Sequence, residues 1–321
     1  MLCGSRIKTV KASGTRALAL SRNTVNTRVL TVNNFTARHT YMNMIWNDRQ
    51  GRLSPLKAST LLVAISPAVV VAYWFFTGAL QPLSIKTALH LVGDWAVRFL
   101  VLTLALTPLQ RIFNYPKIAI VRRMLGVTAF SYAMAHFILY LINVKWDFAF
   151  ATSEIINRFY LTIGFVTLFG LSALAATSFD GALRKLGTKW KMLHRLVYGL
   201  AVLALFHYFL QSKIDVSSAT LMAGLFLLAM TVRVMIARRM ALSPLALTGA
   251  AFGAAALTAL TEFAWYRFAT GVDPTRVLKA NFMLTNGLRP AVSILLIGVA
   301  VAILAYARQR HFAPTRQSAS R

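Results

Sequence analysis

The sequence predicts an all-α fold, a polytopic bundle of about eight transmembrane helices. Hydrophobic residues make up 57% of the 321-residue chain and charged residues only 13%, and the mean hydropathy is +0.61, which is far more apolar than a soluble domain. Apolar runs of about 20 residues recur from Leu56 onward, and each is long enough to cross about 30 Å of hydrocarbon. Because a span in lipid must satisfy its own backbone hydrogen bonds, each run is predicted to be a helix.

The predicted spans follow one another with short connections. In chain order they cover residues 57–79, 87–109, 124–143, 160–177, 193–210, 219–237, 244–266 and 289–307. Six of them precede residue 240, and the last two differ from these by their stretches of small residues, such as GAAFGAAA at 249–256. We therefore expect a six-helix membrane domain over 56–240 and two additional helices over 241–310.

The distribution of charge predicts orientation. The formal net charge is +27, but the 35 Lys and Arg residues lie between the spans and not in one patch with aromatic residues, so the predicted partner is the lipid bilayer and no nucleic acid. Basic residues gather in alternate connections, at 111–123, 184–195 and 233–239, whereas the other connections hold acids such as Asp147 and Asp215. By the positive-inside rule, both termini are predicted to be cytoplasmic.

The two ends of the chain carry little signal. The segment 1–55 is polar and basic and is expected to be a disordered tail or an over-called start, and its residues 1–43 resemble a transit peptide in composition; 311–321 is expected to be a cytoplasmic tail. The single cysteine, Cys3, lies in the first of these tails. Disulfide frameworks, thiolate iron–sulfur sites and covalent CxxCH haem attachment are therefore excluded.

Three histidines lie at membrane depth. His136 is about two-thirds of the way across the third span, and His194 and His207 lie near the inner and outer boundaries of the fifth. Ionisable groups at such depth are costly and usually functional, although each could instead be a neutral histidine hydrogen-bonded to a neighbouring helix. His136 and His207, at similar depth on different helices, suit the axial pair of a bis-histidine haem. Zinc would need three or four ligands and a polar surrounding, which the neighbouring Leu, Phe and Ala residues do not supply.

His194 and His207 cannot hold one site together. Thirteen residues of helix separate them by roughly 20 Å of rise and turn their side chains about 140° apart. They are predicted to serve two sites at two depths, which would form an electron path across the membrane.

Two further residues of the second span are candidates for cofactor binding. His90 lies at its outer end, where a histidine costs little, so a purely structural role is the favoured reading and cofactor binding is the alternative. Arg98 lies deep in the span, four residues after Asp94. It is expected to pair with Asp94 or with an anionic ligand group such as a haem propionate.

Several motifs resemble a known family. The stretches RRMLG (122–126), AHFILY (135–140), RFYLTIGF (158–165), ATSFDGALRKLGTKWKMLHRLVY (176–198) and LFHYF (205–209) are similar to the MsrQ family, formerly YedZ, the haem-binding membrane subunits of the bacterial MsrPQ methionine sulfoxide reductase system. The likeness covers roughly 55–240 and extends more distantly to ferric reductases and NADPH oxidases. It implies that the first six helices form a ferric reductase-like haem-binding core.

The resemblance also implies cofactors and partners. The cofactors would be one or two b-type haems and FMN, with His136 and His207 on the outer haem, His194 on the inner one, and His90 matching a further family histidine. Electrons would pass from the quinone pool or a cytoplasmic flavin reductase to a periplasmic molybdopterin methionine sulfoxide reductase subunit, the partner in a heterodimer at the bacterial inner membrane. Phe159 replaces the proline of the family's RPY motif, and Arg122 and Arg123 occupy the depth at which the oxidase relatives place a second inner haem histidine.

Other functions remain open at this stage. The chain has no soluble catalytic domain, so we expect a non-catalytic electron-transfer subunit and not the enzyme that reduces sulfoxides. A ferric or cupric reductase would share the helices but should carry its own flavin and NAD(P)H domain. A transporter or a packing subunit of a respiratory complex would need no haem.

Overall fold

The computed structural model describes residues 52–213, 215–281, 283 and 287–311, and every regular element within them is a helix. Of the predicted tails, 1–55 and 311–321, residues 1–51 and 312–321 lie outside the described residues, while Pro55 begins α2 and His311 ends α13. The described residues from Ser59 onward form one compact unit. Its long helices are α2 (Pro55–Phe76), α3 (Ser84–Ile112), α4 (Ile118–Asn143), α6 (Phe159–Ala176), α9 (Leu196–Ser212), α10 (Ser217–Ala237), α11 (Pro244–Ala269) and α13 (Pro290–His311).

Eight spans of the described chain are long and apolar enough to cross a membrane, which confirms the predicted polytopic bundle. Short helices connect them and were not predicted. These are α5 (Phe148–Asn157), α7 (Asp180–Leu186), α8 (Thr188–His194) and α12 (Pro274–Ala280). Two of them start at a side-chain cap: the Asp147 carboxylate accepts a hydrogen bond from the Phe150 N–H at the start of α5, and Asp273 does the same for the Thr275 N–H at α12.

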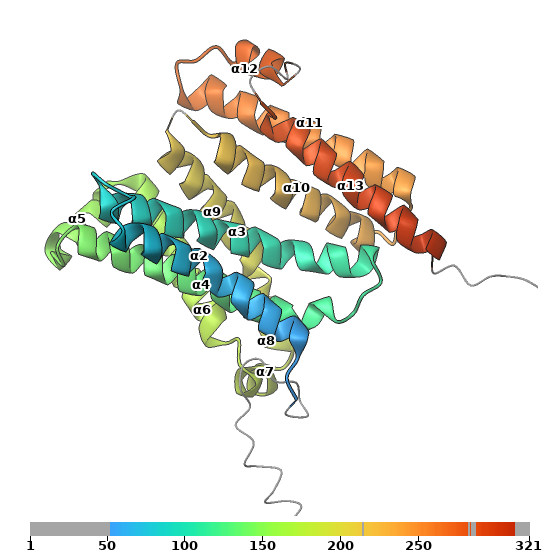
Figure 1. Ribbon diagram of the computed structural model, residues 1–321, viewed down its shortest axis with the longest axis horizontal. Helices are drawn as coiled ribbons and strands as arrows, with labels where there is room; N and C mark the ends of the chain where they lie inside the picture. Colours follow the sequence, from blue (N-terminus) through green and yellow to red (C-terminus); the bar gives the residue numbers. More distant parts are fainter. Residues whose placement is uncertain (1–51, 214, 282, 284–286, 312–321) are drawn as a thin grey trace, which may run out of the picture. The chain divides into compact units, whose positions relative to one another are not determined.

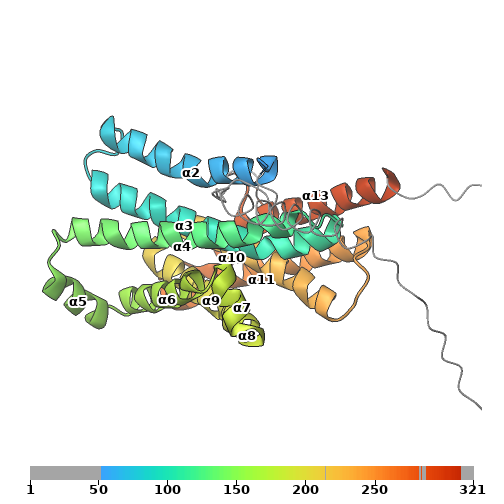
Figure 2. The ribbon, with the colours of Figure 1, turned by 90° about the horizontal axis from the view of Figure 1, so that it is seen from below.

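Four helices form a closed ring of neighbours. α3 packs along α4, α4 contacts α6, α6 packs on α9, and α9 returns to α3. Figures 1 and 2 show α3 and α4 side by side over their length, with α5 beyond the end of α4. The space enclosed by this ring holds the cavities described below.

The last two long helices pack mainly on α10. α10 contacts α3 and α9 on one side and α11 and α13 on the other, and Figure 1 shows α10, α11 and α13 running side by side. The packing is close, because a Cβ atom added to Gly224 of α10 would lie 2.5 Å from Ile294 and one added to Gly298 of α13 would lie 2.4 Å from the Cβ atom of Ala251. Glycine at these crossings lets the helices approach.

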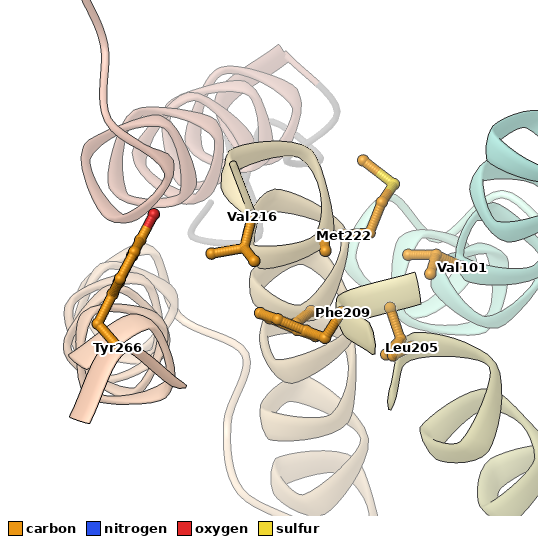
Figure 3. Packing of buried hydrophobic residues seen from close by; sticks show 8 residues of the cluster. Val101, Leu205, Phe209, Val216, Met222 and Tyr266 are labelled. Atoms are coloured by element: carbon orange, nitrogen blue, oxygen red, sulfur yellow. The ribbon is translucent and has the colours of Figure 1, made fainter. Parts of the chain in front are cut away.

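A buried apolar cluster joins the ring to this second group of helices. Val101 of α3, Phe209 of α9, Val216 and Met222 at α10, and Tyr266 of α11 are all buried in it (Figure 3). The ring of Phe209 also packs on Trp265, with centroids 5.1 Å apart. Of the two additional helices, α11 therefore contacts the same helix that carries His207.

The fifth predicted span differs from expectation at its first turn. α8 ends at His194 and α9 begins at Leu196, with Arg195 between them. The backbone at Arg195 keeps right-handed helical angles, but the local bonds are three residues long, from the Arg195 N–H to the Met192 carbonyl and from the Tyr198 N–H to the Arg195 carbonyl, 3.2 Å each. The helix tightens there without ending, so Thr188–Ser212 remains one span.

Candidate functional site: two histidine cavities in the helix ring

A cavity of about 350 Å³ lies inside the four-helix ring. This volume is within the range of cofactor and small-molecule sites. Most of its wall is apolar, from residues such as Leu100, Phe137, Phe165 and Leu168, and its polar residues include His90, Asp94, Tyr208, Gln211 and Asp215. His136 and His207 also line it, on α4 and α9.

The two histidine rings face each other across this cavity. Their centroids are 6.5 Å apart and their planes meet at 82°. His136 Nδ1 lies 2.8 Å from the Leu89 carbonyl oxygen on α3, and His207 Nδ1 lies 2.7 Å from the Tyr160 carbonyl oxygen on α6. Because a carbonyl oxygen only accepts, each Nδ1 carries the hydrogen and each Nε2 keeps its lone pair.

This geometry fits a metal cofactor that brings its own equatorial ligands. Two imidazoles bound on opposite sides of one ion, at about 2 Å per metal–nitrogen bond, place their ring centres roughly 6 Å apart, close to the distance observed here. Within the described part of the chain, no group of three or more His, Cys, Asp or Glu residues could hold a metal ion alone. The residues present therefore suit the axial positions of a haem, and the apolar wall suits its ring.

A second cavity of about 260 Å³ adjoins the first. Leu100 and Leu171 line both cavities, so a thin apolar layer separates them. His194 lines the second cavity. Its ring stacks on Trp190 at 3.9 Å between centroids, with its Nδ1 3.2 Å from the Trp190 carbonyl oxygen and its Nε2 3.4 Å from the Ser178 hydroxyl. The structure thus places His194 and His207 at different cavities.

The second cavity is basic. Five cationic side chains line it, and none of the described lining residues is acidic; the five are Arg122, Arg123, Lys191, Arg195 and Arg233. Arg123 is paired outside the lining with Asp180. Arg233 donates to the Tyr198 hydroxyl at 2.9 Å and to the Leu104 carbonyl at 2.7 Å, while its Nε is buried with no hydrogen-bond partner in the described chain. A cavity of this charge favours a ligand with anionic groups.

The remaining predicted residues lie at the margin. His90 is exposed at the rim of the larger cavity. Arg98 lies 3.8 Å from Asp94, its guanidinium is 4.9 Å from the Trp95 ring centroid, and it is not among the residues that line either cavity. Of the two partners predicted for Arg98, Asp94 and an anionic ligand group, the structure therefore shows Asp94.

Sequence reasoning did not find four residues that contact the histidines. Leu89 and Tyr160 supply the carbonyl oxygens, and Gly93 and Gly164 lie directly against the two rings. In each pair the glycine follows the carbonyl by four residues. This spacing within a helix was visible in the sequence, but nothing in it indicated which glycines face a histidine.

Comparison with known proteins identifies the family. The profile of the ferric reductase like transmembrane component matches residues 92–205, which include His136 and His194. A haem-binding subunit MsrQ of the protein-methionine-sulfoxide reductase of Rhodospirillum rubrum is 36% identical over 194 residues, which are 60% of this chain and 91% of that protein. The chain belongs to the MsrQ family.

Further members agree with this assignment. The MsrQ proteins of Azospira oryzae and Cronobacter sakazakii are 35% and 37% identical over 167 and 161 residues, which cover 51% and 50% of this chain and 72% and 80% of theirs. No solved structure matches the chain. The predicted resemblance to the MsrQ family is confirmed, and with its eight candidate spans the chain is a multi-pass membrane protein.

Proposed function

We propose that this protein is a membrane electron-transfer subunit that holds haem b between His136 and His207. The observation that carries the proposal is the facing pair of imidazoles with free Nε2 atoms in an apolar cavity. The names of its MsrQ relatives, which are called haem-binding subunits, support it. When bound, the haem supplies reversible one-electron chemistry at its iron.

The protein's own residues would bind, orient and shield. His136 and His207 would hold the haem through their Nε2 atoms, and the Leu89 and Tyr160 carbonyls fix the tautomer of each histidine through the hydrogen bonds at Nδ1. The wall of leucine, phenylalanine and alanine side chains keeps water from the ring faces. No described residue in this cavity is needed as a catalytic acid or base for electron transfer, so the subunit would be non-catalytic.

The second cavity is proposed as the inner cofactor site. His194 is its one histidine, so a second haem there would lack a second axial histidine from the lining residues. The five cations suit either the propionates of such a haem or the phosphate of FMN, and the stacked Trp190 suits a planar ring. Because Leu100 and Leu171 border both cavities, the two cofactors would lie close enough for direct transfer.

The proposed orientation rests on charge, and the proposed partners are those that the resemblance to the MsrQ family implies. The basic cavity would face the cytoplasm of a bacterial inner membrane, with both termini on that side. The donor would then be the quinone pool or a cytoplasmic flavin reductase. The acceptor, a periplasmic molybdopterin methionine sulfoxide reductase subunit in a heterodimer, would dock at the opposite end near 144–158 and 211–218.

The test is a dithionite-reduced minus oxidised spectrum with haem quantitation on the purified full chain. His136→Ala and His207→Ala should each abolish the main b-type bands, whereas His194→Ala should cause a separate partial loss. His39→Ala, in the N-terminal tail, is the matched histidine control and should retain the wild-type spectrum. A colourless wild-type protein from haem-sufficient cells would refute the proposal and favour a transporter or packing subunit. Reduction of added ferric chelates by the loaded chain alone would favour the ferric reductase alternative.

A further inference from the structure

Both facing histidines are held by the same local arrangement. His136 donates to the carbonyl of Leu89, four residues before Gly93 on α3. His207 donates to the carbonyl of Tyr160, and Gly164 follows four residues later on α6. In a helix the side chain at position i+4 points back over the carbonyl of residue i. Glycine at that position leaves the carbonyl open to a donor from another helix.

The space at these glycines is filled by the histidine rings themselves. A Cβ atom added to Gly93 would lie 2.7 Å from His136 Nδ1 and 2.9 Å from its Cε1. One added to Gly164 would lie 2.7 Å from His207 Cε1 and 2.9 Å from its Nδ1. Real carbon atoms do not approach so closely, so any side chain here would push the ring away from its carbonyl.

The neighbouring glycines make this contact specific. Gly199, on the same helix as His207, has nothing within 4 Å of an added Cβ atom. Gly170, on the same helix as Gly164, is crowded, but its neighbour is Leu200, whose side chain would lie 2.4 Å from the added atom. Tight packing therefore recurs in the ring of helices, whereas contact with an imidazole occurs at Gly93 and Gly164.

We propose that Gly93 and Gly164 are positioning residues that set the ring orientation of the two axial histidines and preserve the hydrogen bond at each Nδ1. This inference rests on the proposed haem site. The glycines touch the ligands and act through them. Their effect is the near-perpendicular arrangement of the two imidazole planes, 82° apart.

The angle between axial imidazole planes has a direct spectroscopic consequence. Perpendicular planes leave two iron d orbitals nearly equal in energy, and a low-spin ferric haem then has a strongly anisotropic electron paramagnetic resonance signal. Rotation toward parallel planes separates those orbitals and lowers the largest g value. Loss of the Nδ1 hydrogen bond also weakens the ligand as a base, and such outer contacts typically change metal affinity by about 10- to 100-fold.

The experiment compares the ferric resonance spectrum and haem affinity of purified full-length variants. Gly93→Ala and Gly164→Ala should each lower the largest g value or add a high-spin signal, and weaken haem binding roughly 10- to 100-fold. Gly199→Ala should match the wild type. Gly170→Ala should lower thermal stability and keep the wild-type signal, because its added carbon meets a leucine.

A Gly93→Ala protein that fails to fold still tests the inference. In a His136→Gly background the ring that the new carbon would meet is absent, so Gly93→Ala should fold there as well as the His136→Gly protein alone. Failure of that double variant to fold would overturn the inference. So would wild-type spectra in Gly93→Ala and Gly164→Ala at full haem content. A wild type without haem would instead refute the proposed function, and the inference with it.

Discussion

Removing Arg289 should destabilise the C-terminal helices more than any other single loss of charge in them. Glu262 of α11 is only 1% exposed, and its Oε1 accepts a hydrogen bond of 2.6 Å from Nη2 of Arg289, which is itself 23% exposed. The second carboxylate oxygen has a longer contact, 3.5 Å, with the Asn281 amide. In Arg289→Ala the carboxylate would stay buried with one weak partner.

The size of the effect follows from the difference in exposure. Leaving a buried charge without its partner costs about 3–5 kcal/mol, which is roughly a 100- to 1,000-fold change in the ratio of folded to unfolded protein. Glu262→Gln should cost less, about 1–3 kcal/mol, because it removes a charge-assisted hydrogen bond while the partly exposed Arg289 remains solvated. Combining Arg289→Ala with Glu262→Gln should recover part of the loss.

The assay is unfolding of the full chain by SDS in mixed micelles, followed by tryptophan fluorescence. Arg276→Ala is the control, since its pair with Asp273 is exposed and 3.6 Å long, and it should unfold at the wild-type midpoint. The reasoning is refuted if Arg289→Ala costs no more than Glu262→Gln. It is also refuted if the double variant is less stable than Arg289→Ala alone.

Two further predictions concern the contact of Tyr132 with α2 and the carboxylate of Asp215 before α10. The Tyr132 hydroxyl contacts α2, where it donates a hydrogen bond to the Ala64 carbonyl at 2.8 Å and accepts one from the Ala68 N–H at 3.0 Å. Tyr132→Phe should therefore lower the free energy of unfolding by about 1–3 kcal/mol in the same SDS titration and increase hydrogen exchange in α2. Unchanged hydrogen exchange in α2 would contradict this prediction. Hydrogen bonds from Ser217 hold the pKa of Asp215 below its ordinary value of 3.8. The ionised Asp215 therefore stabilises the fold at pH values above 3.8, and this stabilisation is lost as the pH falls through the lower pKa of the folded state. Asp215→Ala should therefore lower the SDS midpoint of unfolding at pH 7, and this midpoint should fall less steeply in acid in the variant than in the wild type. The same dependence of the midpoint on acid pH in both proteins would exclude this role.

The long helices could be predicted because their signal is local. A run of about 20 apolar residues is sufficient to predict a span, and all eight predictions are confirmed. α5, α7, α8 and α12 have at most ten residues each, and their sequences are too short to show an apolar run or a clear period. The starts of α5 and α12 depend on the caps Asp147 and Asp273, which are visible only once the preceding span has ended at the right residue.

The site was predictable only in part, for the same reason. A histidine within an apolar run is conspicuous, so His136, His194 and His207 were found from the sequence. The role of Gly93 depends on a contact with His136 on the next helix. That contact is decided by the crossing of two helices, which no local pattern encodes. Arg233 escaped notice in the same way, because its partners lie on α3 and α9.

The position of the larger cavity along the chain also bears on how the protein is made. Every residue that lines it lies between Leu89 and Ser218, whereas α11 begins at Pro244. Translation proceeds from the N-terminus, so all walls of the cavity have left the ribosome before the last two spans enter the membrane. The docking of α11 and α13 onto α10 therefore adds no lining residue to a cavity whose walls are already complete in the chain.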